Sequence, residues 1–200
     1  MKKFFALFMC LVLCFSFAGC KNYGKTNEAK DIFQKVLHTQ QNFFYRSFVT
    51  DKIIEDNLDN FSFNASANAL ISFTPESYTY VDFDFDNVDE MVINSMELDY
   101  YLVLRYCDNK VFGYIVGARN IIDLRTDGSF MTSSSAAVNS ISNMSFSGTS
   151  FDIKHKANEN DFDNEYLLNG KTSNKETVKK YFSDWDKNTT KVSWTQINRQ

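Results

Sequence analysis

Histidine, proline and glycine are scarce in this sequence: two histidines, one proline and seven glycines occur among 200 residues. His38 and His155 have no cysteine or serine motif beside them, and the serine run at 133–135 lacks the flanking glycines of a nucleophile elbow. The sequence also lacks a glycine-rich phosphate loop and the ligand spacing of a zinc site. Because no catalytic constellation can be assembled from these residues, we expect no catalytic residues and a protein that is not an enzyme.

Excess positive charge is also lacking, since the formal net charge is −4. Proteins that bind nucleic acids are normally basic, so we expect no nucleic-acid partner. Hydrophobic residues make up 44% of the chain and aromatic residues 16%, which indicates a packed core rather than a disordered chain. The twenty phenylalanines and ten tyrosines favour β-strands in that core.

An apolar run at residues 4–17 follows the basic start of the chain and is too short to span a membrane, which is typical of an export signal. The sequence that ends this run, Phe-Ala-Gly-Cys at 17–20, resembles a bacterial lipobox. The resemblance implies that Cys20 is lipidated and becomes the first mature residue, anchored to the extracytoplasmic face of the cell membrane. Ordinary signal cleavage after Ala18 is the alternative.

Cysteines are few, and we expect no disulfide scaffold from them. Cys10 and Cys14 lie in the export signal, and Cys20 is the predicted lipid site. Cys107 then remains in a strand-like run, where we expect a single buried thiol that behaves as a small apolar residue.

Residues 1–19 are therefore predicted to be a lipoprotein signal peptide, 20–26 a tether, and 27–200 a single α+β domain. Apolar periodicity predicts a helix at 27–44 and further short helices around 53–58 and 65–71. Alternating apolar residues and Asp, Asn or Gly turns predict an antiparallel meander. Its expected strands are 78–81, 91–94, 100–107, 111–116, 121–125, 129–132, 140–146, 151–156 and 166–168. A capping box of Ser173 and Glu176 predicts a C-terminal helix, followed by a final strand at 191–196.

An acidic loop between the first two strands of the meander is the most informative stretch of the sequence. Carboxylates stand at its first, third, fifth and ninth positions, and no basic residue occurs between 77 and 101. Because calcium takes six to eight oxygen ligands, largely carboxylates and carbonyls, this spacing predicts a calcium site. The predicted ligands are the side chains of Asp82, Asp84, Asp86 and Glu90 and the carbonyl of Val88.

The loop resembles the short DxDxDGxxD/E calcium loops of dockerin repeats, integrin-type propeller blades and secreted bacterial proteins and lipoproteins. Asn87 stands where these loops carry glycine, and asparagine is the next most tolerant residue for the positive φ required there. The resemblance implies a structural ion that holds two strands in register. The alternatives are a solvated acidic turn without an ion and a magnesium site. A second acidic run at 160–165 has too few ligands for a comparable prediction.

The sequence does not identify a protein or glycan partner. We expect a cell-surface protein with a non-enzymatic binding or structural role, stabilised by the calcium ion. Two alternatives are open: a metal-dependent hydrolase, and a glycan- or peptide-binding module with an exposed aromatic platform. The rings available for that platform are those of Tyr78, Tyr80, Tyr100, Tyr101, Trp185 and Trp194.

Overall fold

The computed structural model describes residues 26–47, 49–66, 69–95 and 99–198. The fold is mostly β with two helices, so the predicted order of N-terminal helix, strands, C-terminal helix and final strand is confirmed. The predicted signal peptide and the lipid site Cys20 lie outside the described residues. Within the described part of the chain, no helix has the length and apolar character needed to cross a membrane.

A seven-stranded sheet forms one half of the fold, with the order β14-β5-β6-β7-β8-β1-β2. Its pairs are antiparallel except for β1 and β8, which run parallel. Its strands are β1 (Phe43–Arg46), β2 (Ile53–Asp56), β5 (Pro75–Val81), β6 (Glu90–Ser95), β7 (Tyr100–Cys107), β8 (Lys110–Gly117) and β14 (Thr195–Gln196). A separate hairpin is formed by β3 (Ser62–Ser66) and β4 (Ala69–Ser72).

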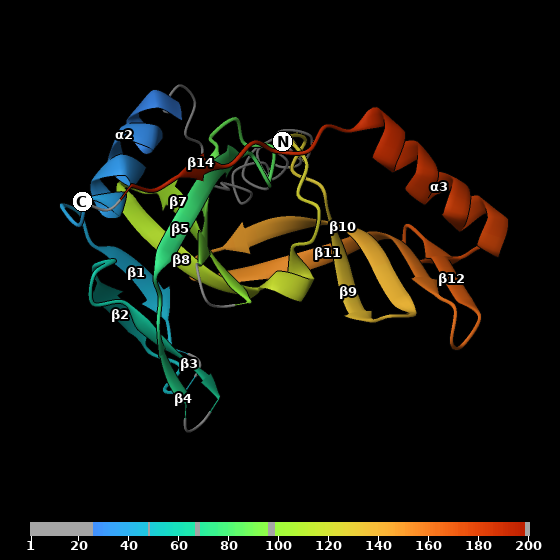
Figure 1. Ribbon diagram of the computed structural model, residues 1–200, viewed down its shortest axis with the longest axis horizontal. Helices are drawn as coiled ribbons and strands as arrows, with labels where there is room; N and C mark the ends of the chain where they lie inside the picture. Colours follow the sequence, from blue (N-terminus) through green and yellow to red (C-terminus); the bar gives the residue numbers. More distant parts are fainter. Residues whose placement is uncertain (1–25, 48, 67–68, 96–98, 199–200) are drawn as a thin grey trace, which may run out of the picture.

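A five-stranded antiparallel sheet forms the other half, with the order β13-β12-β11-β10-β9. Its strands are β9 (Phe130–Ser135), β10 (Val138–Ser147), β11 (Ser150–Asn160), β12 (Glu165–Leu168) and β13 (Lys171–Thr172). The helices α2 (Thr26–Leu37) and α3 (Lys175–Asn188) lie at opposite ends of the molecule (Figure 1). A short 3-10 turn, η1 (Ala118–Asn120), follows β8.

Two apolar clusters form the core, and the central strands of the seven-stranded sheet contribute to both. Alternate residues of a strand point to opposite faces. On β6, Met91 and Ile93 accordingly enter the cluster that contains α2 residues and the β3–β4 hairpin, whereas Val92 enters the cluster that contains residues of β9 and β10. The middle of this sheet is therefore buried on both faces, which provides a rigid support for the loop between β5 and β6.

The segment between α2 and β5 differs from its prediction. The helix expected at 27–44 ends at Leu37, and the helices expected at 53–58 and 65–71 are instead parts of β2, β3 and β4. Phe44 lies beside Phe112 in the parallel pair of β1 and β8, so pairing with a distant segment overrides the local helical pattern.

Smaller corrections concern the C-terminal half. Residues 121–125 form two isolated bridges, Ile122 with Met131 and Arg125 with Lys191, rather than a strand. The N-cap of α3 is Asn174, whose side chain accepts the Thr177 N–H, and not Ser173. The last strand is limited to Thr195–Gln196.

Cys107 is disulfide-bonded, so the expectation of a lone thiol is wrong. The other three cysteines all lie in residues 1–25, outside the described part of the chain. If Cys10 and Cys14 are removed with the signal segment and Cys20 carries lipid, Cys107 has no possible partner within the chain.

Candidate functional site

The acidic loop connects β5 to β6, and hydrogen bonds from its own backbone hold its shape. The Asp82 carboxylate accepts the N–H of Asp86 (3.2 Å) and the N–H of Asn87 (3.0 Å). Asp86 in turn accepts the Val88 N–H at 2.8 Å. Asn87 has a φ of 66°, as predicted for the sixth loop position. The first carboxylate thus closes the bend around the fifth and sixth residues, in a conformation that asparagine tolerates.

The three aspartates converge. Asp82, Asp84 and Asp86 each present one carboxylate oxygen within 4.8 Å of the other two, and all three residues are partly buried. Two oxygens on opposite sides of a calcium ion, each about 2.4 Å from it, are about 4.8 Å apart. The group is therefore compact enough to surround a single metal ion.

Glu90 lies apart from the three convergent aspartates, and the side chain of Val88 is buried. Glu90 is 1% exposed, and its Oε2 accepts the N–H of Phe83 at 3.0 Å. It is not part of the convergent group. Val88 is buried in the cluster beside α2. Glu90 thus ties the end of the loop to its beginning.

The aromatic residues of the loop do not both pack inward. Phe83 is buried and contacts the ring of Phe130. Phe85, however, is 61% exposed and has a φ of 60°.

Arg105 on β7 is the functional residue that sequence reasoning missed. Its Nη2 lies 2.6 Å from Asp84 Oδ2 and 3.3 Å from Asp86 Oδ2, and its Nε lies 3.5 Å from Glu90 Oε1. No basic residue occurs between 77 and 101, and Arg105 lies just beyond the end of this range. The register of β6 and β7, which pairs Met91 with Leu104, places Arg105 beside Glu90. Pairing the two predicted strands in this register would therefore have identified Arg105 as a neighbour of the acidic loop.

The acidic site keeps an excess of negative charge despite Arg105. Four carboxyl groups face one buried guanidinium, and Asp89 is already paired with Lys30 at 2.7 Å. Burial, followed by repulsion from Asp84, raises the pKa of Glu90 well above its usual value. Burial also raises the pKa of Asp84, although Arg105 opposes that shift. An added cation would offset this unfavourable clustering.

One oxygen of the site has no internal partner. Asp84 Oδ1 is buried and accepts no hydrogen bond from any residue that the structure describes, whereas Asp84 Oδ2 binds Arg105. A buried carboxylate oxygen without a partner is unfavourable, because it has lost its hydrogen bonds to water and forms none within the protein. The donor set is also entirely hard oxygen, which suits calcium or magnesium rather than a thiophilic metal. The site therefore fits a hard divalent cation.

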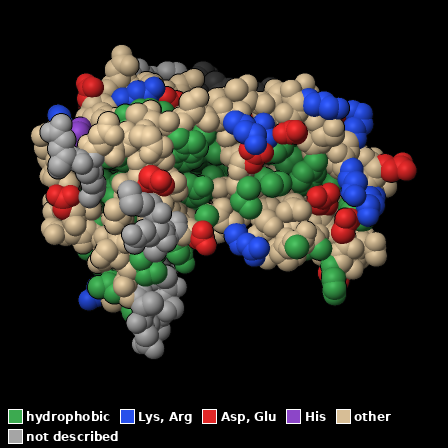
Figure 2. Space-filling model, in the orientation of Figure 1, with side chains coloured by type: hydrophobic (Ala, Val, Ile, Leu, Met, Phe, Trp, Pro, Cys, Tyr) green, Lys and Arg blue, Asp and Glu red, His purple; other side chains and the backbone are tan. Residues whose placement is uncertain are grey.

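The second acidic run, at 160–165, is an ion-paired turn. The Asn160 side chain accepts the N–H groups of Phe162 and Asp163, and Asp161 lies 3.0 Å from Lys175 on α3. Figure 2 shows lysine and arginine side chains mixed with acidic ones at the α3 end of the molecule. Lysines of α3 thus already neutralise Asp161 in this run.

Several rings of the predicted aromatic platform pack against other rings. Tyr101 stacks on Trp194 with 5.9 Å between centroids, and Tyr100 meets Phe63 edge-on at 5.0 Å. Trp185 is held by a hydrogen bond to Ser129 and lies under the guanidinium of Arg125. These contacts favour a packing role for the rings.

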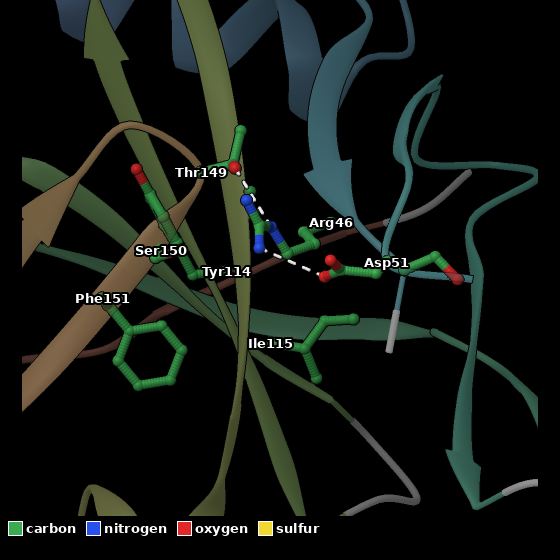
Figure 3. A pocket seen from close by; sticks show the side chains of 9 residues that line it. Arg46, Asp51, Tyr114, Ile115, Thr149, Ser150 and Phe151 are labelled. Atoms are coloured by element: carbon green, nitrogen blue, oxygen red, sulfur yellow. Dashed lines mark hydrogen bonds and ion pairs between the residues drawn. The ribbon is translucent and has the colours of Figure 1, made fainter. Parts of the chain in front are cut away.

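A pocket of about 230 Å³ lies where the two sheets meet (Figure 3). Arg46 crosses it between Asp51, at 3.1 Å, and the hydroxyl of Thr149, at 3.3 Å. The arginine therefore already pairs with two of the polar side chains that line this pocket.

Comparison of the chain with protein-family models, with curated proteins and with solved structures found no match. The likeness to DxDxDGxxE loops thus remains a resemblance of residue spacing, joined here by the convergence of Asp82, Asp84 and Asp86.

Proposed function

We propose that this chain is a lipid-anchored protein of the extracytoplasmic cell surface, with a non-enzymatic binding or structural role, whose acidic loop binds one structural calcium ion. The observation that carries the metal proposal is the convergence of Asp82, Asp84 and Asp86 within 4.8 Å. The lipid anchor rests on the export signal and the lipobox-like residues that end in Cys20, and it requires that Cys20 is not the disulfide partner of Cys107.

The loop supplies most of an oxygen shell. Asp82, Asp84 and Asp86 provide carboxylate oxygens, and the Val88 carbonyl and Glu90 are the further ligands predicted from spacing. When bound, the ion would supply positive charge and a fixed bridge between the ends of β5 and β6. Arg105 already neutralises part of the site, so calcium must compete with it for Asp84 and Asp86. We therefore expect an affinity typical of extracellular modules, on the order of 10⁻⁴–10⁻³ M.

Calcium should raise the melting temperature of the full chain. At a concentration about tenfold above the dissociation constant, binding adds about 1.4 kcal/mol, which corresponds to about 3–6 °C for a chain of this size. The measurement is a thermal melt followed by circular dichroism, with calcium and then with excess chelator. Asp82→Asn should remove most of the shift because it removes one ligand charge.

Asp163→Asn, in the ion-paired acidic turn, serves as the matched control and should leave the calcium shift unchanged. A melting temperature of the parent chain that is the same in millimolar calcium and in chelator would contradict the metal proposal.

The anchor is tested separately by mass spectrometry of the membrane fraction. We expect the N-terminal peptide to begin at Cys20 and to carry a diacylglyceryl group, which supplies two acyl chains, with a third chain where the amine is also modified. More than one chain is needed, because a single acyl chain gives only marginal membrane binding. A mature chain that begins at Gly19, or one whose Cys20 thiol is held in a disulfide, would exclude lipidation.

A further inference from the structure

One edge of the seven-stranded sheet is β2, which no other described strand covers on its outer side. Figure 1 shows this strand at the margin of the molecule, next to β1. Its apolar residues are unusually accessible, with Ile53 57% and Ile54 36% exposed. Exposed apolar edge strands are templates for pairing with another strand, and proteins normally shorten, charge or cover them.

The register of β1 and β2 shows which backbone groups of β2 face outward. The Lys52 carbonyl accepts the Ser47 N–H at 2.9 Å, so the backbone of Lys52 points toward β1. Because this direction alternates along an antiparallel strand, the backbones of Ile54 and Asp56 also point toward β1. The N–H and C=O groups of Ile53 and Glu55 therefore point away from the sheet.

We propose that β2 pairs with β2 of a second copy of this chain, antiparallel and about a two-fold axis at Ile54, to form a continuous sheet. Pairing of two outward edges requires Ile53 to meet an outward-facing residue of the partner. The two-fold axis at Ile54 places Ile53 opposite Glu55. The same axis places Lys52 opposite Asp56, once on each side of the axis. The edge is thus complementary in charge to a second copy of itself.

The alternative symmetric registers lack this complementarity. An axis at Ile53 would place Lys52 opposite Ile54, and an axis at Glu55 would place Ile54 opposite Asp56. Opposite charges directly across a strand pair are favourable, and a charged residue opposite an apolar one gains nothing comparable. The charge pairs therefore favour β2 of a second copy as the partner, in the register with its axis at Ile54.

Disulfide trapping in cells that express the full chain tests this pairing. Ile54→Cys should form an intermolecular disulfide on mild oxidation, because residues that face each other in a non-hydrogen-bonded pair lie about 4.5 Å apart at Cα. Ile53→Cys is the matched control, since it is more exposed yet lies diagonal to its own copy at about 7–8 Å. We expect at least about fivefold more dimer from Ile54→Cys on a non-reducing gel. The parent chain reports any background from exchange with the disulfide of Cys107.

The charge pairs supply a second test within the Ile54→Cys chain. Lys52→Asp should reduce the trapped dimer, because it places like charges opposite each other, and the added change Asp56→Lys should restore it. Equal trapping by Ile53→Cys and Ile54→Cys would overturn the proposal. Loss of dimer in Lys52→Asp without recovery in the double variant would overturn the register.

Discussion

Replacing Arg105 with methionine should lower the free energy of unfolding of the calcium-free chain by about 3–5 kcal/mol, because removal of one member of a buried ion pair leaves uncompensated buried charge. Arg105 is 6% exposed and is within 3.5 Å of Asp84, Asp86 and Glu90. Methionine keeps much of the side-chain length but brings no charge. Urea unfolding followed by circular dichroism in the presence of chelator measures the loss.

The same variant should bind calcium more tightly than the parent, since the ion no longer competes with a guanidinium for the carboxylates. Calcium should therefore restore part of the lost stability, which a purely structural salt bridge would not allow. Arg119→Met, at an exposed position of η1, is the control and should change stability by no more than about 0.5 kcal/mol. Equal effects of the two substitutions would show that Arg105 does not hold the acidic loop.

Replacing Gly128 with alanine should destabilise the chain by about 2–4 kcal/mol, from backbone strain combined with overpacking. Gly128 has a φ of 75°, and a Cβ there would lie 2.4 Å from the carbonyl oxygen of Asp82 and 3.2 Å from the Cα of Phe83. Both neighbours are backbone atoms, so no side-chain rotation can relieve the overlap. The first residues of the acidic loop would have to move, and calcium affinity should fall together with stability.

Gly148→Ala separates the effect of backbone strain from the effect of steric overlap. Its φ of 57° is similarly unfavourable for alanine, but no atom lies within 4 Å of the added Cβ. We expect it to cost about 1 kcal/mol, the penalty of the left-handed conformation alone, and to leave calcium binding unchanged. Calorimetric unfolding together with a calcium titration of both variants makes the comparison. A Gly128→Ala chain with the stability and calcium affinity of Gly148→Ala would contradict the described contact with the acidic loop.

The strands after residue 77 were largely predictable because their turns are encoded locally. Asp108 and Asn109 both adopt positive φ in the turn between β7 and β8, and Asn169 and Gly170 do so after β12. Asp, Asn and Gly tolerate this conformation best, so they mark turns between alternating apolar runs. The strand expected at 100–107 matches β7 for this reason.

The segment between α2 and β5 was not predictable in the same way, because its partners are distant in sequence. β1 pairs in parallel with β8, placing Phe44 beside Phe112, and it pairs with β2 on its other side. A short apolar run fits a helix and a strand equally well until such partners are known. Tertiary pairing therefore decided the conformation of this segment.

In the candidate site, too, the features set by nearby residues were predictable, and those set by residues distant in sequence were not. The spacing of Asp82, Asp84 and Asp86 was sufficient to predict their convergence, since a tight bend turns alternate residues to one centre. Arg105 was missed because it enters the site from the neighbouring strand β7. Glu90 has the predicted position in sequence, but its contacts with Phe83 and Arg105 depend on how β5, β6 and β7 pack together.

The most direct test of the central claim is a crystal structure of the protein grown in calcium, with an anomalous map of the acidic loop. We expect one peak among Asp82, Asp84 and Asp86, with six to eight oxygens about 2.3–2.6 Å away and Arg105 withdrawn from Asp84. A loop with no peak in saturating calcium, in which Arg105 keeps its contact with Asp84, would show that the guanidinium alone neutralises the acidic residues.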